Sequence, residues 1–212
     1  LYSRGLFPLA AAIRRGNKSQ FASTQEHRQR IVNLIKDYRT LLGQGVVARF
    51  DPETYSDAVA FARIGEGSLG GKARGLAFMN SMILKHRLYD KHANVRIMIP
   101  RSVVIATDYF DDFIRLNGLK YIISQEFSDE EILSEFVSST VPARLQQELK
   151  AYIQTVRTPL AVRSSSKLED SHYQPFAGIY STYMIPYVDN GDQMLRLLLK
   201  AVKSVYASVY FA

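Results

Sequence analysis

The sequence contains neither cysteine nor tryptophan among its 212 residues. Without cysteine it has no disulfide framework, no thiolate nucleophile and no cysteine-ligated zinc or iron–sulfur site. Long apolar runs are missing too: the stretch over residues 6–13 is far shorter than the about 18 apolar residues that cross a bilayer. We therefore expect no membrane contact, and the lack of cysteine fits the reducing cytoplasm as the location.

Charge is unevenly distributed along the chain. The net charge is +7, with 22% charged and 47% hydrophobic residues, which is typical of a folded domain. The first 50 residues hold nine basic and two acidic side chains, so the whole excess lies there and the remainder is neutral. Such a shift indicates a boundary. We predict a basic helical lead-in or interdomain segment over 1–50 and a separate domain over 51–212.

Hydrophobic periodicity and capping signals predict a mixture of helices and short strands. An amphipathic helix is expected to follow the capping box at Ser23–Glu26, and another to begin at Asp51 and run through Phe61. The other expected helices cover 72–88, 107–116, 128–137, 142–156 and 192–210, and the expected strands cover 95–99, 102–105, 159–163 and 179–185. This order favours an α+β fold.

A glycine-rich loop over residues 65–72 ends in Gly-Gly-Lys at the start of a predicted helix. Glycines let backbone amides approach a phosphate, and a helix start favours anions, so Lys72 there indicates anion binding. The loop is not a Walker A motif, and its Gly-x-Gly-x-x-Gly match is expected to follow a helix rather than the strand of a dinucleotide site. The alternative is a flexible loop between helices.

Two later segments also carry polar groups suited to a nucleotide. The strand ending at Arg163 delivers a guanidinium and then three serines, a plausible phosphate clamp, although a strand followed by a polar turn explains the same residues. Over residues 175–182, Gly178 stands between small and aromatic neighbours and could form a flap over a ligand, whereas a simple tight turn is equally allowed.

In this order, the three segments resemble the PEP/pyruvate-binding, ATP-grasp-type N-terminal domain of phosphoenolpyruvate synthase and pyruvate phosphate dikinase. The resemblance covers residues 64–212. It rests on Gly-Gly-Lys, a Val-Arg-Ser-Ser strand end, a Glu-Asp pair, and Phe-Ala-Gly followed by Thr-Tyr. It implies an α+β, ATP-grasp-like nucleotide-binding lobe, its N-terminal part, preceded by the helical lead-in.

The resemblance implies that Lys72 and Arg163 bind the phosphates of ATP, that Gly178 lies in a loop over the nucleotide, and that Thr182 contacts it from the adjoining strand. The other implied ATP-binding residues are Ser164, Ser165 and Glu169. In phosphoryl transfer the protein positions groups and stabilises charge, so Lys72 and Arg163 are expected to act electrostatically. We assign no catalytic acid, base or nucleophile in this chain.

In the resembled family the Mg²⁺ ligands and the phosphate-carrying histidine lie in later segments. The sequence up to Ala212 matches neither, so we expect a truncated piece of a longer enzyme, with ATP and Mg²⁺ as cofactors and the Mg²⁺ ligands outside this chain. The four histidines are predicted to be ordinary surface or structural residues. The expected partners are ATP and the remaining domains of the parent enzyme, including a phospho-histidine domain.

The expected parent is an ATP-dependent phosphotransferase, a dikinase that phosphorylates a carrier histidine and then pyruvate to form phosphoenolpyruvate. The isolated chain is expected to be inactive. One alternative is the same lobe from a dikinase with a glucan or antibiotic acceptor. Another is a basic docking or nucleic-acid-binding module on a degenerate nucleotide fold, which the lack of interleaved aromatic residues disfavours.

Overall fold

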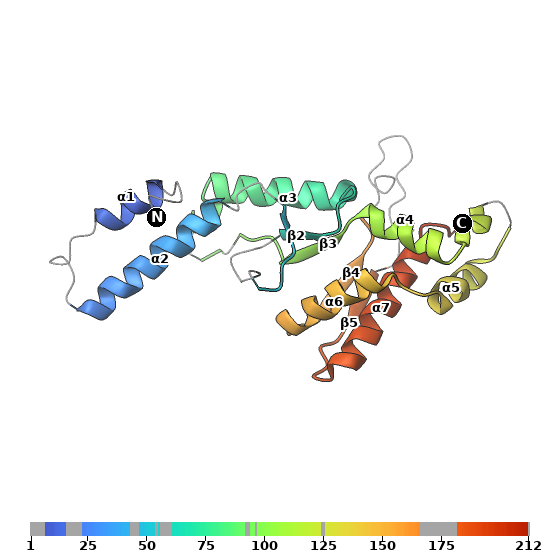
Figure 1. The fold of residues 1–212 in the computed structure, drawn as a ribbon. Coiled ribbons are helices and arrows are strands. Elements are labelled where there is room, and N and C mark those ends of the chain that lie inside the picture. Colours follow the sequence, from blue (N-terminus) through green and yellow to red (C-terminus); the bar gives the residue numbers. More distant parts are fainter. Residues whose placement is uncertain are drawn as a thin grey trace.

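The computed structural model of the chain describes residues 7–15, 23–42, 47–53, 55, 61–91, 94–95, 97–123, 126–165 and 182–211. Within these ranges the chain forms seven α-helices and five short strands (Figure 1). The fold is α+β, as the order of helix and strand signals predicts.

Three parallel strands form the first sheet. They are β1 (Ala48–Arg49), β2 (Phe61–Ile64) and β3 (Ser102–Ile105), in the order β1-β2-β3. The glycine-rich loop and α3 (Gly70–Lys85) follow β2, and α4 (Thr107–Leu116) follows β3. Because β2 and β3 are parallel and paired along their whole length, the glycine-rich loop and the start of α4 emerge at the same edge of the sheet.

The second sheet is an antiparallel pair, β4 (Leu160–Arg163) and β5 (Thr182–Ile185), in which Arg163 lies opposite Thr182. Side chains alternate between its two faces. On the inner face, Leu160, Val162, Tyr183 and Ile185 belong to the core or pack against it. The other face, with Arg163 and Thr182, is exposed. A nucleotide can therefore reach both of these side chains.

The main core lies where α4, α5 (Asp129–Ser138), α6 (Ala143–Thr155) and α7 (Gly191–Ala207) meet (Figure 1). Phe113 on α4 and Phe136 on α5 are fully buried, with ring centroids 5.6 Å apart. The apolar residues of α7 recur at helical spacing, and the buried ones face this core. The short helices η3 (Leu88–Asp90) and η4 (Leu119–Ile123) follow α3 and α4.

The basic lead-in is helical, as predicted. Helices α1 (Phe7–Arg14) and α2 (Thr24–Leu42) lie together at one end of the molecule (Figure 1). The amide of Glu26 donates to the Ser23 hydroxyl at 3.1 Å, which is half of the expected capping box. Strand β1 also falls within the first 50 residues, yet it pairs with β2 and so belongs to the first sheet. Among the described residues no helix is long and apolar enough to span a bilayer.

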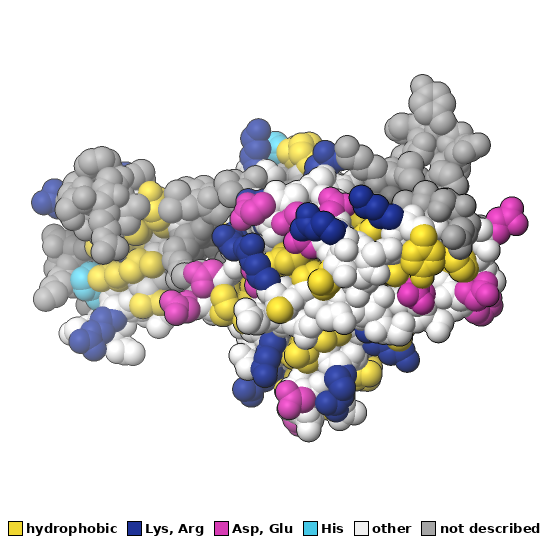
Figure 2. Space-filling view, turned by 45° about the vertical axis from the view of Figure 1, so that its right-hand side comes forward, with side chains coloured by type: hydrophobic (Ala, Val, Ile, Leu, Met, Phe, Trp, Pro, Cys, Tyr) yellow, Lys and Arg dark blue, Asp and Glu magenta, His cyan; other side chains and the backbone are white. Residues whose placement is uncertain are grey.

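Charges of both signs are interspersed over the main body in Figure 2. This distribution agrees with the balanced charge of residues 51–212. A broad field of one sign is absent from the described part of this face. Individual cations therefore matter more than overall charge for ligand binding there.

The predicted helix from Asp51 to Phe61 is wrong over its described residues. Pro52 and Glu53 form a turn, with the Glu53 amide donating to the Asp51 carboxylate at 3.0 Å, and Phe61 opens strand β2. Pairing of β2 with strands on both sides outweighs the local helix signals. A strand therefore does precede the glycine-rich loop. The Gly-x-Gly-x-x-Gly match thus has the preceding strand that a dinucleotide site requires.

The predicted strand over 95–99 is also wrong, because no strand forms at residues 95 and 97–99, the described part of that range. Val95 and Met98 are exposed there, and β3 pairs only with β2 among the described strands. The remaining predicted elements are confirmed within a few residues. Of the strand predicted over 179–185, only 182–185 lies within the described residues.

Candidate functional site

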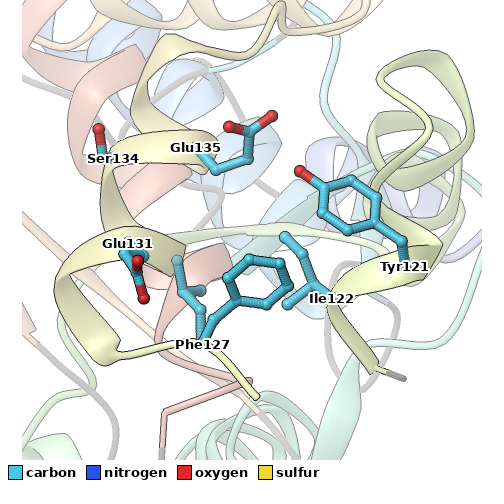
Figure 3. Close-up of a pocket in the computed structure, with 7 residues that line it drawn as sticks. Tyr121, Ile122, Phe127, Glu131, Ser134 and Glu135 are labelled. Atoms are coloured by element: carbon cyan, nitrogen blue, oxygen red, sulfur yellow. The ribbon is translucent and has the colours of Figure 1, made fainter. Parts of the chain in front are cut away.

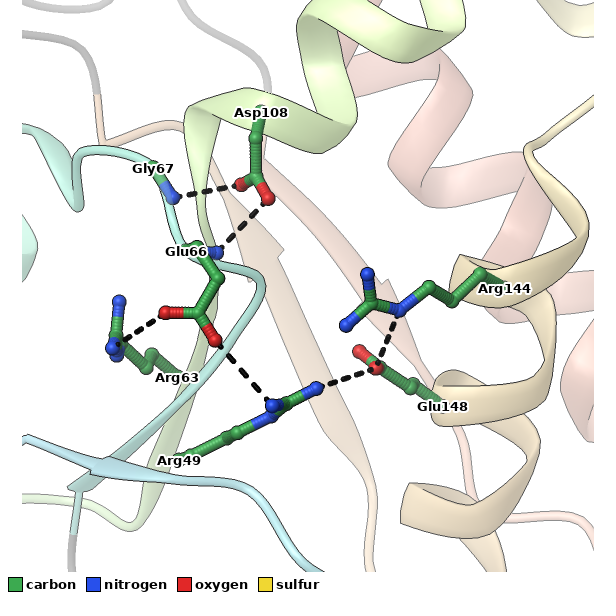
Figure 4. A network of polar contacts seen from close by, with 7 residues as sticks. All are labelled: Arg49, Arg63, Glu66, Gly67, Asp108, Arg144 and Glu148. Atoms are coloured by element: carbon green, nitrogen blue, oxygen red, sulfur yellow. Dashed lines mark hydrogen bonds and ion pairs between the residues drawn. The ribbon is translucent and has the colours of Figure 1, made fainter.

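The first part of the glycine-rich loop, residues 65–69 before α3, binds an anion that the chain itself supplies. The amides of Glu66 and Gly67 donate to the two carboxylate oxygens of Asp108, at 2.9 and 3.0 Å (Figure 4). Asp108 lies in the first turn of α4. A Cβ at Gly67 would lie 2.6 Å from the Asp108 amide, so only glycine allows this close approach. The loop is thus built around a carboxylate.

Partial burial acts to raise the pKa of Asp108, but backbone hydrogen bonds from Glu66, Gly67, Asp108 itself and Tyr109 together outweigh it and lower the pKa below its usual value. A parallel contact joins Ser68 to α4, because its amide donates to the Thr107 hydroxyl at 3.0 Å. Helix α4 starts at Thr107 as expected, and Ala106 is its N-cap. The side chains of Thr107 and Asp108 both hold the glycine-rich loop.

The start of α3 is capped by Ser165, which follows β4. The Ser165 hydroxyl accepts from the Ala73 amide at 2.9 Å and donates to the Leu69 carbonyl at 2.8 Å. Its carbonyl accepts from the Gly71 amide at 3.0 Å. The first amides of a helix have no acceptor within the helix, and here a distant segment supplies the acceptors. Ser165 thereby ties the end of β4 to the glycine-rich loop.

Gly70 permits this junction. Its φ of +77° lies in the left-handed region, and a Cβ at this position would lie 1.7 Å from the Ser165 carbonyl oxygen. A side chain is excluded on both grounds. The second glycine of the Gly-Gly-Lys motif and Lys72 follow directly in the first turn of α3.

Five of the predicted site residues, Ser165 included, lie at or beside this junction. Lys72 stands between the two α3 amides that bind Ser165, and Arg163 precedes Ser165 by two residues. Thr182 lies across the sheet from Arg163, and Ser164 lies between Arg163 and Ser165. The first turn of α3 has no acidic residue, and Lys72 lies at the positive end of the helix dipole.

Two predicted site residues, Glu169 and Gly178, lie outside the described residues. Sequence reasoning missed the contacts of Asp108 and Thr107 with the glycine-rich loop. A signal was available, since the two strands that precede these segments could have been expected to pair in parallel. That signal was lost when β2 was predicted as helix.

An ion-pair network lies beside the glycine-rich loop (Figure 4). Glu66 pairs with Arg63 at 2.9 Å and with Arg49 at 3.5 Å. Arg49 also reaches Glu148 at 3.8 Å, and Glu148 pairs with Arg144 at 3.4 Å. The network connects β1 and β2 to α6. These partly exposed pairs add little stability individually.

Two shallow pockets are lined by no residue of the glycine-rich loop. One, of about 240 Å³, lies between η4 and α5 and is lined by Tyr121, Phe127 and Glu135 among others (Figure 3). The other, of about 440 Å³, lies between β1 and α6, next to the ion-pair network. Neither includes a residue of β4, and neither contains Lys72 or Arg163.

No group of three or more histidine, aspartate or glutamate side chains that could hold a metal ion occurs within the described ranges. The described site is thus a set of cations and hydroxyls without a metal-ligand cluster. Such a set is suited to binding an anionic ligand by charge and hydrogen bonds.

Comparison with known proteins identifies one family. The family model described as pyruvate phosphate dikinase, AMP/ATP-binding domain, matches residues 66–212, well over half of the chain. Searches of curated proteins and of solved structures found no match. The matched range begins in the glycine-rich loop and includes α3, β4, β5 and α7.

Proposed function

Because the chain belongs to the pyruvate phosphate dikinase AMP/ATP-binding domain family, we propose that Lys72 and Arg163 bind the phosphates of ATP in this nucleotide-binding lobe. The observation that carries the proposal is the Ser165 junction, which brings the first turn of α3 to the end of β4. Two cations from segments 91 residues apart are thereby held near each other.

Side chains, rather than loop amides, contact the phosphates in this proposal. The amides of Glu66 and Gly67 are bound to Asp108, and those of Gly71 and Ala73 to Ser165. A guanidinium offers a fork of donors to phosphate oxygens, and a lysine offers a mobile point charge.

The exposed face of the β4–β5 sheet extends the site. Thr182 and Arg163 share this face with Ala161 and Met184, whose side chain is 73% exposed. We propose that Thr182 contacts the nucleotide from this face, and that Ser164 and Glu169 assist. Gly178, in the segment between β4 and β5, would lie in the loop over the nucleotide.

In the parent enzyme the bound ATP would phosphorylate a carrier histidine of another domain, and pyruvate would receive that phosphate to form phosphoenolpyruvate. Lys72 and Arg163 would hold the transferring phosphates in place and offset their developing charge. Mg²⁺ would accompany ATP, but the described residues offer no ligand set for it, so we assign it no step. A glucan or antibiotic acceptor remains the alternative.

We further propose that residues 1–50, apart from strand β1, form a separate lead-in that contacts other parts of the parent enzyme. Residues 51–212, together with β1, would form the nucleotide lobe of an enzyme that works in the cytoplasm. The basic composition of the lead-in and the position of α1 and α2 at one end of the molecule support the first of these (Figure 1).

The test is a calorimetric titration of ATP into the chain and its variants. Lys72→Ala and Arg163→Ala should each weaken binding about tenfold or more, which corresponds to the loss of one charge-assisted contact. Lys85→Ala, at the other end of α3, and Arg196→Ala, exposed on α7, are matched controls and should bind as the parent chain does. Unchanged affinity in both site variants would overturn the proposal.

A further inference from the structure

The start of α3 depends on Ser165, whose hydroxyl binds the amide of Ala73, 92 residues earlier in the chain. The residue before the helix, Leu69, has no side chain that can accept a hydrogen bond, and the first turn contains no acidic residue. Ser165 supplies the missing acceptors with its hydroxyl and its carbonyl. The helix therefore obtains its cap from the end of β4.

We propose that Ser165 is a positioning residue for the nucleotide: it fixes Lys72 relative to Arg163 and does not itself bind the phosphates. This inference rests on the proposed function. It replaces the role of direct ATP contact that the family resemblance implies for Ser165.

The hydroxyl of Ser165 has one proton to donate, and it donates this proton to the Leu69 carbonyl at 2.8 Å. A phosphate oxygen is an acceptor and needs a donor. The hydroxyl could donate to a phosphate only by giving up that bond, which would leave the carbonyl of the partly buried Leu69 without its donor. The hydroxyl is thus committed to the protein.

The contacts of Ser165 flank Lys72 on both sides. Gly71 donates to its carbonyl and Ala73 to its hydroxyl, so the backbone of Lys72 is held between two fixed points. At Gly70 the two backbones pack directly against each other, since a Cβ there would lie 1.7 Å from the Ser165 carbonyl oxygen. Loss of the hydroxyl removes one of the two fixed points. The backbone at the start of α3, and with it Lys72, then gains conformational freedom that ATP binding must restrict.

A double-mutant cycle on ATP affinity separates positioning from direct contact. Calorimetry would compare the parent chain, Ser165→Ala, Lys72→Ala and the double variant, with a second cycle that uses Arg163→Ala. Ser165→Ala alone should weaken ATP binding about tenfold. In the Lys72→Ala background the same change should weaken it less than about twofold, because the lysine that Ser165 positions is gone.

The Arg163→Ala background should retain the about tenfold effect, since the β4–β5 pairing rather than Ser165 places Arg163. Faster hydrogen exchange of the Ala73 amide in Ser165→Ala should show that the cap has been lost, and circular dichroism should show that each variant is folded. An undiminished effect of Ser165→Ala in the Lys72→Ala background would overturn the inference, as would unchanged affinity in Ser165→Ala alone. Absence of ATP binding by the parent chain would instead overturn the proposed function.

Discussion

Replacing Gly70 by alanine should break the junction between α3 and β4. The backbone of Gly70 has a left-handed φ of +77°, and a Cβ would lie 1.7 Å from the Ser165 carbonyl oxygen. A non-glycine residue in this region costs about 1–2 kcal/mol. The clash with a backbone atom must also separate the two segments, which breaks the bond from Gly71 and weakens those of the Ser165 hydroxyl, at about 1 kcal/mol each.

Together these terms predict that Gly70→Ala lowers the free energy of unfolding by about 3–5 kcal/mol. For a chain of this size the midpoint of thermal unfolding should fall by roughly 10 °C. Urea unfolding followed by far-ultraviolet circular dichroism measures the change, since the chain has no tryptophan. An unchanged slope of the free energy with urea would show that stability, not the extent of unfolding, has altered.

Gly75→Ala is the matched control, because Gly75 lies on the same helix and a Cβ there meets no atom within 4 Å. Alanine favours the helix interior, so this variant should gain about 0.5–1 kcal/mol. Equal stability of the two variants would refute the argument that Gly70 and Ser165 form a tight junction.

Three further substitutions test the surrounding structure. Asp108→Asn should lower the free energy of unfolding by about 2 kcal/mol at pH 7. Because the pKa of Asp108 is lowered on folding, this difference should persist above about pH 4 and shrink as the pH falls further. A pH-independent difference in urea unfolding would contradict this prediction. Lys203→Met should lower the free energy of unfolding by about 1 kcal/mol in the same assay, because two carbonyls at the end of α5 lose their donor. A stabilised variant would show that these hydrogen bonds contribute nothing to stability. Phe136→Ala, in the core, should lower the free energy of unfolding by about 3–5 kcal/mol. Phe78→Ala should lower it by less than about 0.5 kcal/mol, because Phe78 is 66% exposed on α3. Similar losses of stability in thermal unfolding of the two variants would show that the core lies elsewhere.

The sequence predicted the elements whose signals are local. The capping box at Ser128 is complete in the structure, with the Glu131 amide and carboxylate both bonded to Ser128, so α5 begins as expected. Pro142 precedes α6, and the apolar spacing of α7 correctly indicated a long amphipathic helix. In each case residues within one or two turns determine the outcome.

The elements that sequence reasoning missed depend on contacts between distant segments. Strand β2 forms because β1 and β3 pair with it, and no local pattern at Phe61 indicates those partners. Similarly, Asp108 resembles a helix-capping residue in sequence, but its carboxylate binds amides more than 40 residues away. Folding brings these groups together only when the sheet has formed.

The candidate site was predictable in its residue types but not in their roles. Gly-Gly-Lys and the strand ending at Arg163 lie in the two segments that the Ser165 contacts join. That Ser165 would cap α3 could not be read from spacing, since capping patterns apply to neighbouring residues. ATP contacts of Lys72, Arg163 and Thr182 remain predictions.

The most direct test of the account is whether ATP shields Lys72. Limited acetylation of lysines, quantified by peptide mass spectrometry, would compare Lys72 with Lys85 in the same helix, with and without millimolar ATP. The account predicts that ATP slows modification of Lys72 several-fold while Lys85 is unaffected, and that adenosine, which lacks phosphates, slows neither. Equal modification of Lys72 with and without ATP would contradict the claim that this lysine binds the nucleotide phosphates.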